Sequence, residues 1–308
     1  MAENSTQAQQ EIIAGLTATP AHISPKYFYD TPGSTLFEEI TRLPEYYPTR
    51  SERQIMARHG EAMAQHLGSG RTVIEFGAGS CEKARALCHL IDPARFIAVD
   101  ISADFLHQAA ESLRQTFPTL DVRPLVADLT GSLRLPDDLP RANRLLFYPG
   151  SSIGNFDPPQ ALDMLNRFRQ LLDNDGALLI GIDLAKTQAI LEAAYDDAKG
   201  ITAAFNRNVL SHVNRLIGSN FDPPDWRHVA FFNGRQSRIE MHLEASADSE
   251  IRWPGGHRRF ATGERIHTEN SYKYRLRQFS DLLARAGFSR TQTWTDKQAW
   301  FAVVLARP

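Results

Sequence analysis

The sequence has few cysteines and no long apolar run, and each absence excludes a class of protein. Two cysteines, Cys81 and Cys88, occur in 308 residues, which is too few for the disulfide framework of a small secreted domain. No stretch approaches the roughly 20 apolar residues that span a bilayer. The first 16 residues also lack the basic and apolar regions of a secretory signal. We therefore expect a cytoplasmic protein with no membrane partner.

Charge of either sign is also in little excess. The chain has 34 basic and 36 acidic residues, a formal net charge of −2, whereas nucleic-acid binding calls for a basic surface. The ten histidines form no H-E-x-x-H or facial carboxylate motif. We expect a small-molecule substrate, no nucleic acid, no metal and a monomer.

Apolar runs alternate with helical patterns through the middle of the chain. The runs are RTVIEF, RFIAVD, VRPLVA, RLLFY and GALLIGID, and such alternation predicts a doubly wound, mostly parallel sheet. The alternation stops after Lys186, and a final helix and hairpin are expected to rejoin the sheet. We therefore predict an α/β, Rossmann-like core of residues 52–186 and 274–308. Residues 1–51 and 187–273 would form a smaller domain.

The N-terminal region contains one clear helical pattern. STLFEEITRL spaces its apolar residues for a helix over residues 34–43, with Ser34 as N-cap, before Pro44 ends it. The polar first ten residues are expected to fray.

The turn EFGAG at residues 75–79 is the strongest local signal. Gly77 and Gly79 let the backbone approach a ligand where a strand meets a helix. A dinucleotide site would continue the pattern to a third glycine, but Glu82 stands there, which argues against a phosphate ligand. The acidic start suits a cationic cofactor that carries an amino acid. Taken alone, the motif is also compatible with an ordinary turn.

Acidic residues also follow the next two expected strands. Asp100 lies about 20 residues beyond the turn, where a carboxylate accepts bonds from ribose hydroxyls. Asp128 occupies the place from which an adenine amino group is held. The three acidic strand ends predict one cofactor cleft.

Two polar clusters are candidates for substrate contacts. YPGSSIGNF, at residues 148–156, follows the fourth strand, and Asn155 there either positions a substrate or caps the loop. Glu269 and Ser271 are two residues apart on an expected strand, so their side chains point the same way. They either grip a polar ligand or lie on a solvated face.

Four segments together resemble the histidine Nα-methyltransferases of ergothioneine biosynthesis. They are FYDTPGSTLFEEITRLPEYYPTRSE, VIEFGAGSCEKAR, YPGSSIGNF and RIHTENSYKY. The resemblance implies a class I methyltransferase sheet with a substrate-binding domain formed by the N-terminus and an insertion. The implied reaction moves three methyl groups from S-adenosylmethionine to the α-amine of L-histidine, giving hercynine and S-adenosylhomocysteine. Alternatives are methylation of another amino-acid amine, such as a tryptophan derivative, and a non-catalytic S-adenosylmethionine-binding protein.

The resemblance also implies roles for individual residues. Glu269 and Ser271 would bind the substrate imidazole, with Met241 packed near it. Asn155 and a tyrosine, Tyr46 or else Tyr47, would bind the substrate carboxylate or amine, and Tyr46 and Asn155 are the catalytic candidates. Gly150 and Tyr195 would line the same pocket. The implied cofactor residues, with Gly79 added from the turn motif, are Tyr29, Gly77, Gly79, Lys83, Asp100 and Asp128.

Overall fold

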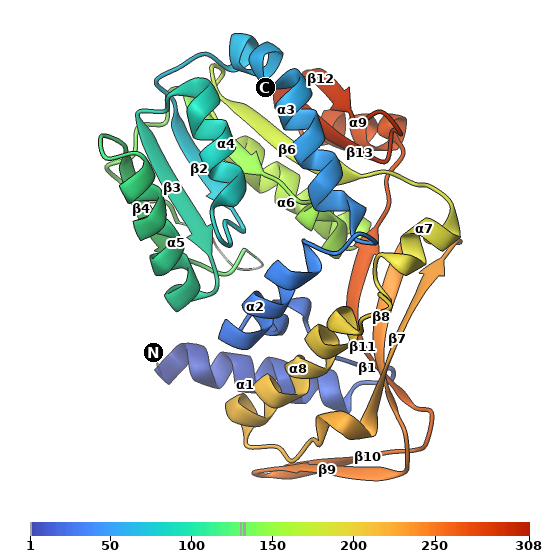
Figure 1. Cartoon of the computed structure of the whole chain (residues 1–308). Helices are drawn as coiled ribbons and strands as arrows, with labels where there is room; N and C mark the ends of the chain where they lie inside the picture. The colour runs from blue at the N-terminus through green and yellow to red at the C-terminus, as the bar shows by residue number, and fades with distance from the viewer. Residues whose placement is uncertain (1, 130, 132–133) are drawn as a thin grey trace. The chain divides into compact units, whose positions relative to one another are not determined.

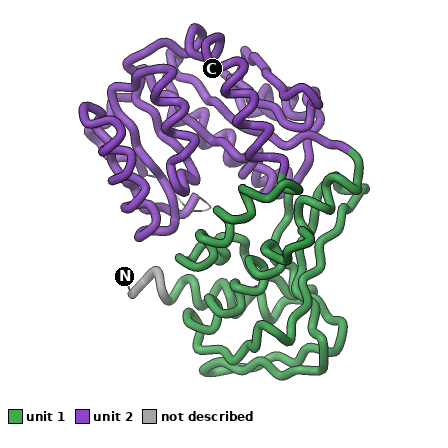
Figure 2. The backbone as a smooth tube through the Cα atoms, in the orientation of Figure 1, with its two compact units in different colours: residues 1–46, 187–271 green, residues 47–186, 272–308 purple. Residues whose placement is uncertain are grey.

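The computed structural model describes residues 2–129, 131 and 134–308, and it divides into two compact units (Figure 2). Unit 1 comprises residues 1–46 and 187–271, and unit 2 comprises residues 47–186 and 272–308. The sequence predicted boundaries after residues 51, 186 and 273, whereas the structure divides the chain after residues 46, 186 and 271. The first boundary differs because one helix, Tyr47–Leu67, belongs to unit 2 from its first residue.

Unit 2 is built around a seven-stranded sheet (Figure 1). Its strands are β2 (Thr72–Phe76), β3 (Arg95–Asp100), β4 (Asp121–Val126), β5 (Arg144–Tyr148), β6 (Ala177–Asp183), β12 (Arg290–Thr295) and β13 (Phe301–Arg307). The order is β12-β13-β6-β5-β2-β3-β4, in which β13 runs antiparallel to β6 and β12, whereas β2 to β6 pair in parallel. The predicted α/β, Rossmann-like sheet with a returning hairpin is confirmed.

Helices cover both faces of this sheet. They are α3 (Tyr47–Leu67), α4 (Glu82–Ile91), α5 (Ala103–Thr116), α6 (Pro158–Gln170) and α9 (Leu276–Arg285). Side chains of α3, α4 and α5 form one core with alternate strand residues such as Val73. Those of α6 and α9 form a second core with residues such as Ile74. Strands buried on both faces have no polar alternation, which is why the sequence shows continuous apolar runs here.

Unit 1 combines helices with two small sheets. Its helices are α1 (Ala2–Thr17), α2 (Thr31–Ile40), α7 (Gln188–Ala193) and α8 (Ile201–Ile217), with short 3-10 turns η1 (Pro25–Phe28) and η3 (Pro223–Asp225). One sheet has the order β1-β11-β8-β7, from β1 (Ala21–His22), β7 (Trp226–Asn233), β8 (Arg238–Ala245) and β11 (Arg265–Tyr272). The other pairs β9 (Ser249–Trp253) with β10 (Gly256–Phe260). Helix α8 packs against α1, α2, β7 and β8.

Two expectations for the N-terminal region are wrong. Helix α2 begins at Thr31 rather than Ser34, because Asp30 is the N-cap and its side chain accepts a hydrogen bond from the Gly33 backbone N–H at 2.8 Å. The first residues form α1 instead of fraying. Ile12 and Leu16 on α1 are almost completely buried, and their packing supplies the stability that the local sequence lacks.

None of the helices in the described part of the chain is both long and apolar enough to cross a membrane.

Candidate active site

The parallel sheet of unit 2 reverses its winding between β2 and β5. The chain proceeds from β2 to β3 and β4 on one side, then returns to β5 and β6 on the other. Ligands of such sheets bind outside the carboxyl ends of the strands at this point. Gly77 and Gly79, which follow β2, have φ angles of +65° and +51°, and a Cβ at either would have no heavy atom within 4 Å. The turn therefore leaves open space beside its backbone.

Asp100 joins this turn to the neighbouring strand end. Its Oδ2 accepts a hydrogen bond from Gly79 N at 3.0 Å, and its Oδ1 accepts one from Ser102 N at 2.9 Å. The backbone carbonyl of Asp100 accepts from Ala127 N at 3.0 Å, next to Asp128. Each carboxylate oxygen keeps a second lone pair, so the arrangement fits a ribose diol.

Glu75, on β2 just before the glycine turn, has a buried carboxyl oxygen whose hydrogen-bonding capacity is unsatisfied within the described part of the chain. It is 1% exposed, and its Oε2 has no hydrogen-bond partner among the described residues. Burial raises the pKa of Glu75 well above its ordinary value, although Lys83 opposes the shift. A cationic ligand nearby would favour the charged form. An orphaned buried carboxyl beside an open glycine turn fits a positively charged nucleoside such as S-adenosylmethionine.

Lys83 has a partner that sequence analysis missed. Its Nζ lies 2.7 Å from Glu52 Oε2 on α3. Glu52 is buried, and its two oxygens accept from Gly150 N at 3.0 and 3.1 Å. An ammonium has three donors, so this ion pair leaves Lys83 able to bind a ligand carboxylate as well. The ion pair also connects α4 to the loop after β5.

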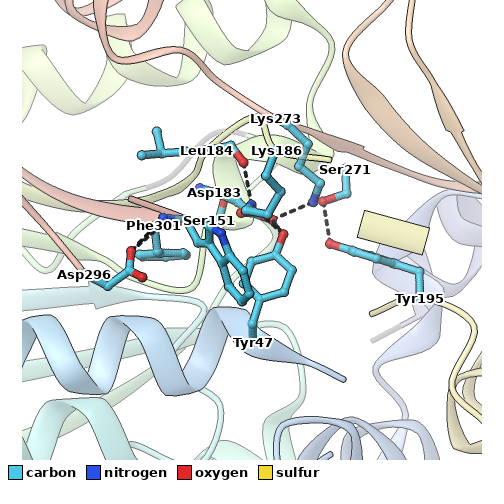
Figure 3. A network of polar contacts seen from close by, with 11 residues as sticks. Tyr47, Ser151, Asp183, Leu184, Lys186, Tyr195, Ser271, Lys273, Asp296 and Phe301 are labelled. Atoms are coloured by element: carbon cyan, nitrogen blue, oxygen red, sulfur yellow. Dashed lines mark hydrogen bonds and ion pairs between the residues drawn. The ribbon is translucent and has the colours of Figure 1, made fainter. Parts of the chain in front are cut away.

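A buried polar network contacts that loop at Ser151 (Figure 3). Asp183, at the end of β6, accepts from Tyr47 OH at 2.7 Å and from Lys273 Nζ at 2.8 Å through Oδ2. Lys186 Nζ contacts Asp183 Oδ1 at 2.5 Å and donates to Tyr47 OH at 2.7 Å. The backbone N–H of Asp183 donates to Ser151 Oγ at 2.8 Å. The network therefore fixes the position of the segment that contains Gly150 and Asn155.

The charges of this network set its protonation. Burial alone would raise the pKa of Asp183, but the ammonium groups of Lys273 and Lys186 outweigh it and lower that pKa. Burial lowers the pKa of Lys186 to about 8. Asp183 could have been suspected as an acid at a strand end, but no local pattern identified its lysine and tyrosine partners.

In unit 1, the candidate tyrosines lie in one aromatic cluster. The Tyr46 ring packs edge-on against Phe37 and Tyr195, each with a centroid distance of 6.2 Å. The Tyr29 ring lies 5.8 Å from Phe37. The Tyr195 hydroxyl shares a 2.7 Å hydrogen bond with Ser271 Oγ. Tyr29, expected to bind the cofactor, thus belongs to unit 1 together with Tyr46 and Tyr195, whereas Tyr47 belongs to the Asp183 network of unit 2.

Buried and more exposed residues alternate along β11 except at Thr268 and Glu269, which are adjacent and both buried. His267 and Asn270 are partly exposed on the other face and lie 2.9 Å apart, Nε2 to Oδ1. Glu269 and Ser271 are 7% and 5% exposed, so a solvated face is excluded for them. Met241 on β8 is also buried, and its backbone carbonyl accepts from Thr268 Oγ1 at 3.1 Å.

Comparison with known proteins agrees with this geometry. A family described as histidine-specific, S-adenosylmethionine-dependent methyltransferases matches residues 8–308. The chain belongs to this family. It is 38% identical to a histidine N-alpha-methyltransferase of Mycolicibacterium smegmatis over 99% of this chain and 96% of the relative. It is 37% identical to the Mycobacterium tuberculosis protein of the same name, over 97% and 94%.

A more distant comparison supports the fold of this family member. A Nostoc punctiforme structure assigned as an O-methyltransferase superposes with a TM-score of 0.50 at 13% identity, covering 99% of this chain and 68% of the other. At that identity the likeness concerns the fold alone.

In this methyltransferase the loop after β5 requires a glycine at residue 150. Gly150 has a φ of +81°, and a Cβ there would lie 2.8 Å from Lys83 Nζ. Asn155 ends the 3-10 turn η2 (Ser152–Asn155) that follows. The two candidates thus share one short segment, which Glu52 and Asp183 both anchor.

Proposed function

We propose that the protein trimethylates the α-amine of L-histidine to hercynine, a step of ergothioneine biosynthesis. The relatives' names and the description of the family support histidine as the substrate. The observation that carries the proposal is the buried carboxyl group of Glu269, two residues before the buried Ser271 on β11, which shares a hydrogen bond with the Tyr195 hydroxyl.

S-adenosylmethionine supplies a methyl group that is already activated on its sulfonium. The chain's own residues therefore need to bind and orient, and no protein nucleophile is required. We assign the cofactor ribose to Asp100, its amino-acid portion to the Glu75–Lys83 region and its adenine to Asp128. Gly77 and Gly79 keep the backbone accessible, as their open surroundings allow.

Selectivity for histidine would come from Glu269. A carboxylate that is 7% exposed would accept a charge-assisted hydrogen bond from an imidazole N–H, and a substrate without that donor forgoes about 1.5–3 kcal/mol. Ser271, oriented by the Tyr195 hydroxyl at 2.7 Å, offers a second polar contact to the ring. Met241 supplies the apolar wall.

The amine end of the substrate is assigned to Tyr46 and Asn155. The α-amine must lose its proton to act as a nucleophile, and with an α-amino pKa of about 8 an appreciable minority is neutral at cellular pH. Holding this neutral amine in line with the methyl is then the main task of the residues that bind it.

The test is mass spectrometry of a reaction that contains the protein, S-adenosylmethionine and an equimolar mixture of the twenty amino acids. We expect a mass gain of three methyl groups on histidine alone. Methylation of another amino acid would refute the pocket assignment and keep the methyltransferase. A product that stops at one or two methyl groups would refute trimethylation, and binding of the cofactor without any product would indicate a non-catalytic protein.

A further inference from the structure

Three potential metal ligands meet on the unit 1 sheet, on the face opposite Met241. Glu240 and His242 flank Met241 on β8, so their side chains share the other face of the strand. His267 comes from β11, the neighbouring strand. One ligand atom from each of the three lies within 4.8 Å of the other two. Two ligands spaced two residues apart on one strand and a third on the neighbouring strand can together coordinate a small ion.

The carboxylate of Glu240 presents one oxygen to this corner. Its Oε1 accepts from Asn233 Nδ2 at 2.8 Å and from Arg238 Nε at 2.9 Å. Its Oε2 instead lies 3.2 Å from His242 Nε2. The partners of Oε1 hold the carboxylate in place, as outer-shell groups do in metal sites, while Oε2 remains directed at His242.

The two imidazoles are held in place and uncharged. The His242 ring stacks on Phe231 at 5.4 Å with an interplanar angle of 6°, and it lies 5.0 Å from the His267 ring. His242 Nδ1 is buried without a hydrogen-bond partner among the described residues. Burial lowers the pKa of His242 to about 4 and also lowers that of His267. Neutral imidazoles are the form that binds metals.

We propose that Glu240, His242 and His267 bind a Zn²⁺-type transition-metal ion. Two imidazoles and a carboxylate form a ligand set that Zn²⁺ accepts, with water in the fourth position. The ion would join β8 to β11, the two strands whose opposite faces carry Met241, Glu269 and Ser271. Asn270 Oδ1, 2.9 Å from His267 Nε2, would orient that ring.

Two arginine side chains near the proposed site reduce its affinity for a metal ion. Arg238 is paired with Glu240 at 2.8 Å, and Arg265 contributes to lowering the pKa of His242. Both repel a divalent ion, so we expect weaker binding than at a structural zinc site with four protein ligands.

The proposal is tested by titrating the tag-free, metal-free full chain with Zn²⁺ in a calorimeter and with Co²⁺ by visible absorption. We expect one equivalent to bind saturably, and the Co²⁺ spectrum to show four-coordinate bands. His242→Phe and His267→Leu should each weaken binding by at least about tenfold, a loss seen even for groups that only support the ligands. Circular dichroism would verify that both variants are folded.

The matched control is His257→Ala. His257 is an exposed histidine of the same unit, 3.8 Å from Glu250, and it belongs to no three-ligand cluster among the described residues. This variant should bind as the wild type does. Absence of one-to-one binding, or equal weakening in all three variants, would overturn the proposal. Because the readout is metal binding without cofactor or substrate, its failure leaves the proposed methylation untouched.

Discussion

At the scale of single residues, the Tyr195 hydroxyl orients Ser271 in the proposed imidazole site. We expect Tyr195→Phe to raise the KM for histidine by about fivefold with little change in kcat, because the lost hydrogen bond to Ser271 Oγ is worth about 1 kcal/mol. Steady-state kinetics with saturating cofactor would measure this change.

A suitable control for Tyr195→Phe is Tyr27→Phe in the same unit. The Tyr27 hydroxyl has a long contact of 3.4 Å to the Ala8 carbonyl, so its loss should leave the KM for histidine unchanged. If both variants behave alike, Tyr195 does not orient Ser271 for substrate.

Asp183 balances two buried ammonium groups. The side chains of Lys273 and Lys186 are 0% and 4% exposed. Asp183→Asn would remove the buried carboxylate with which both lysines pair, and we expect the free energy of unfolding to fall by about 3–5 kcal/mol. Urea denaturation at neutral pH measures the loss.

The control for Asp183→Asn is Asp173→Asn, which removes the exposed pair between Arg141 and Asp173, whose side chains are 56% and 46% exposed. That variant should lose less than about 1 kcal/mol. A similarly small loss for Asp183→Asn would contradict the role of Asp183 as the counter-ion of the network.

At the scale of elements, Asp30 connects the start of α2 to α8. Its Oδ1 accepts from Gly33 N at 2.8 Å and from Asn208 Nδ2 at 2.7 Å, and Arg215 pairs with its Oδ2. Asp30→Ala removes the cap together with these contacts, and we expect a loss of about 1–2 kcal/mol in the free energy of unfolding.

Ser102→Ala provides the comparison, because Ser102 is the N-cap of α5 and makes no side-chain cap hydrogen bond. The Ser102→Ala variant should lose at most about 0.5 kcal/mol in the free energy of unfolding, as measured by thermal or urea denaturation. Equal losses in the two variants would mean that the Asp30 contacts do not stabilise α2.

Strand β11 shows why periodicity alone could not place its side chains. The two-residue spacing correctly predicted that Glu269 and Ser271 point the same way. It did not predict which face they occupy, because the phase changes at Thr268 and Glu269. That change separates His267 and Asn270 from the buried pair, and it depends on packing that no local pattern records.

At the scale of the whole molecule, the two units are expected to divide the ligands between them. Asp100→Asn, in unit 2, should weaken S-adenosylmethionine binding and leave histidine binding intact. Glu269→Gln, in unit 1, should do the reverse, by at least about tenfold for histidine, since a hydrogen bond to a charged group is worth about 1.5–3 kcal/mol. Calorimetric titration with each ligand alone measures both affinities.

Thermal stability provides an independent measurement of the same division. Ligand at 100 times its dissociation constant stabilises the native state by about 2.7 kcal/mol, and each variant should lose the stabilisation by one ligand. Loss of both in either variant would contradict the assignment of cofactor to unit 2 and of the imidazole contact to unit 1.

The sequence by itself determined the order of strands and helices in unit 2, the glycine turn and the acidic strand ends. These features are local, because burial on both faces produces continuous apolar runs and a turn with positive φ favours glycine. It also predicted a boundary after Lys186, where the alternation of strand and helix stops. The sequence did not predict the α1 helix, because the stability of this helix comes from packing against residues distant in the chain.

Only the tertiary structure decided which distant side chains meet. Tyr47 and Asp183, which are 136 residues apart, share a hydrogen bond, and this separates Tyr47 from Tyr46, its neighbour in the chain. Glu52 pairs with Lys83, and Glu240 and His242 meet His267, by the same long-range packing. Such contacts depend on how strands and helices are brought together in space, so no spacing along the chain could have predicted them.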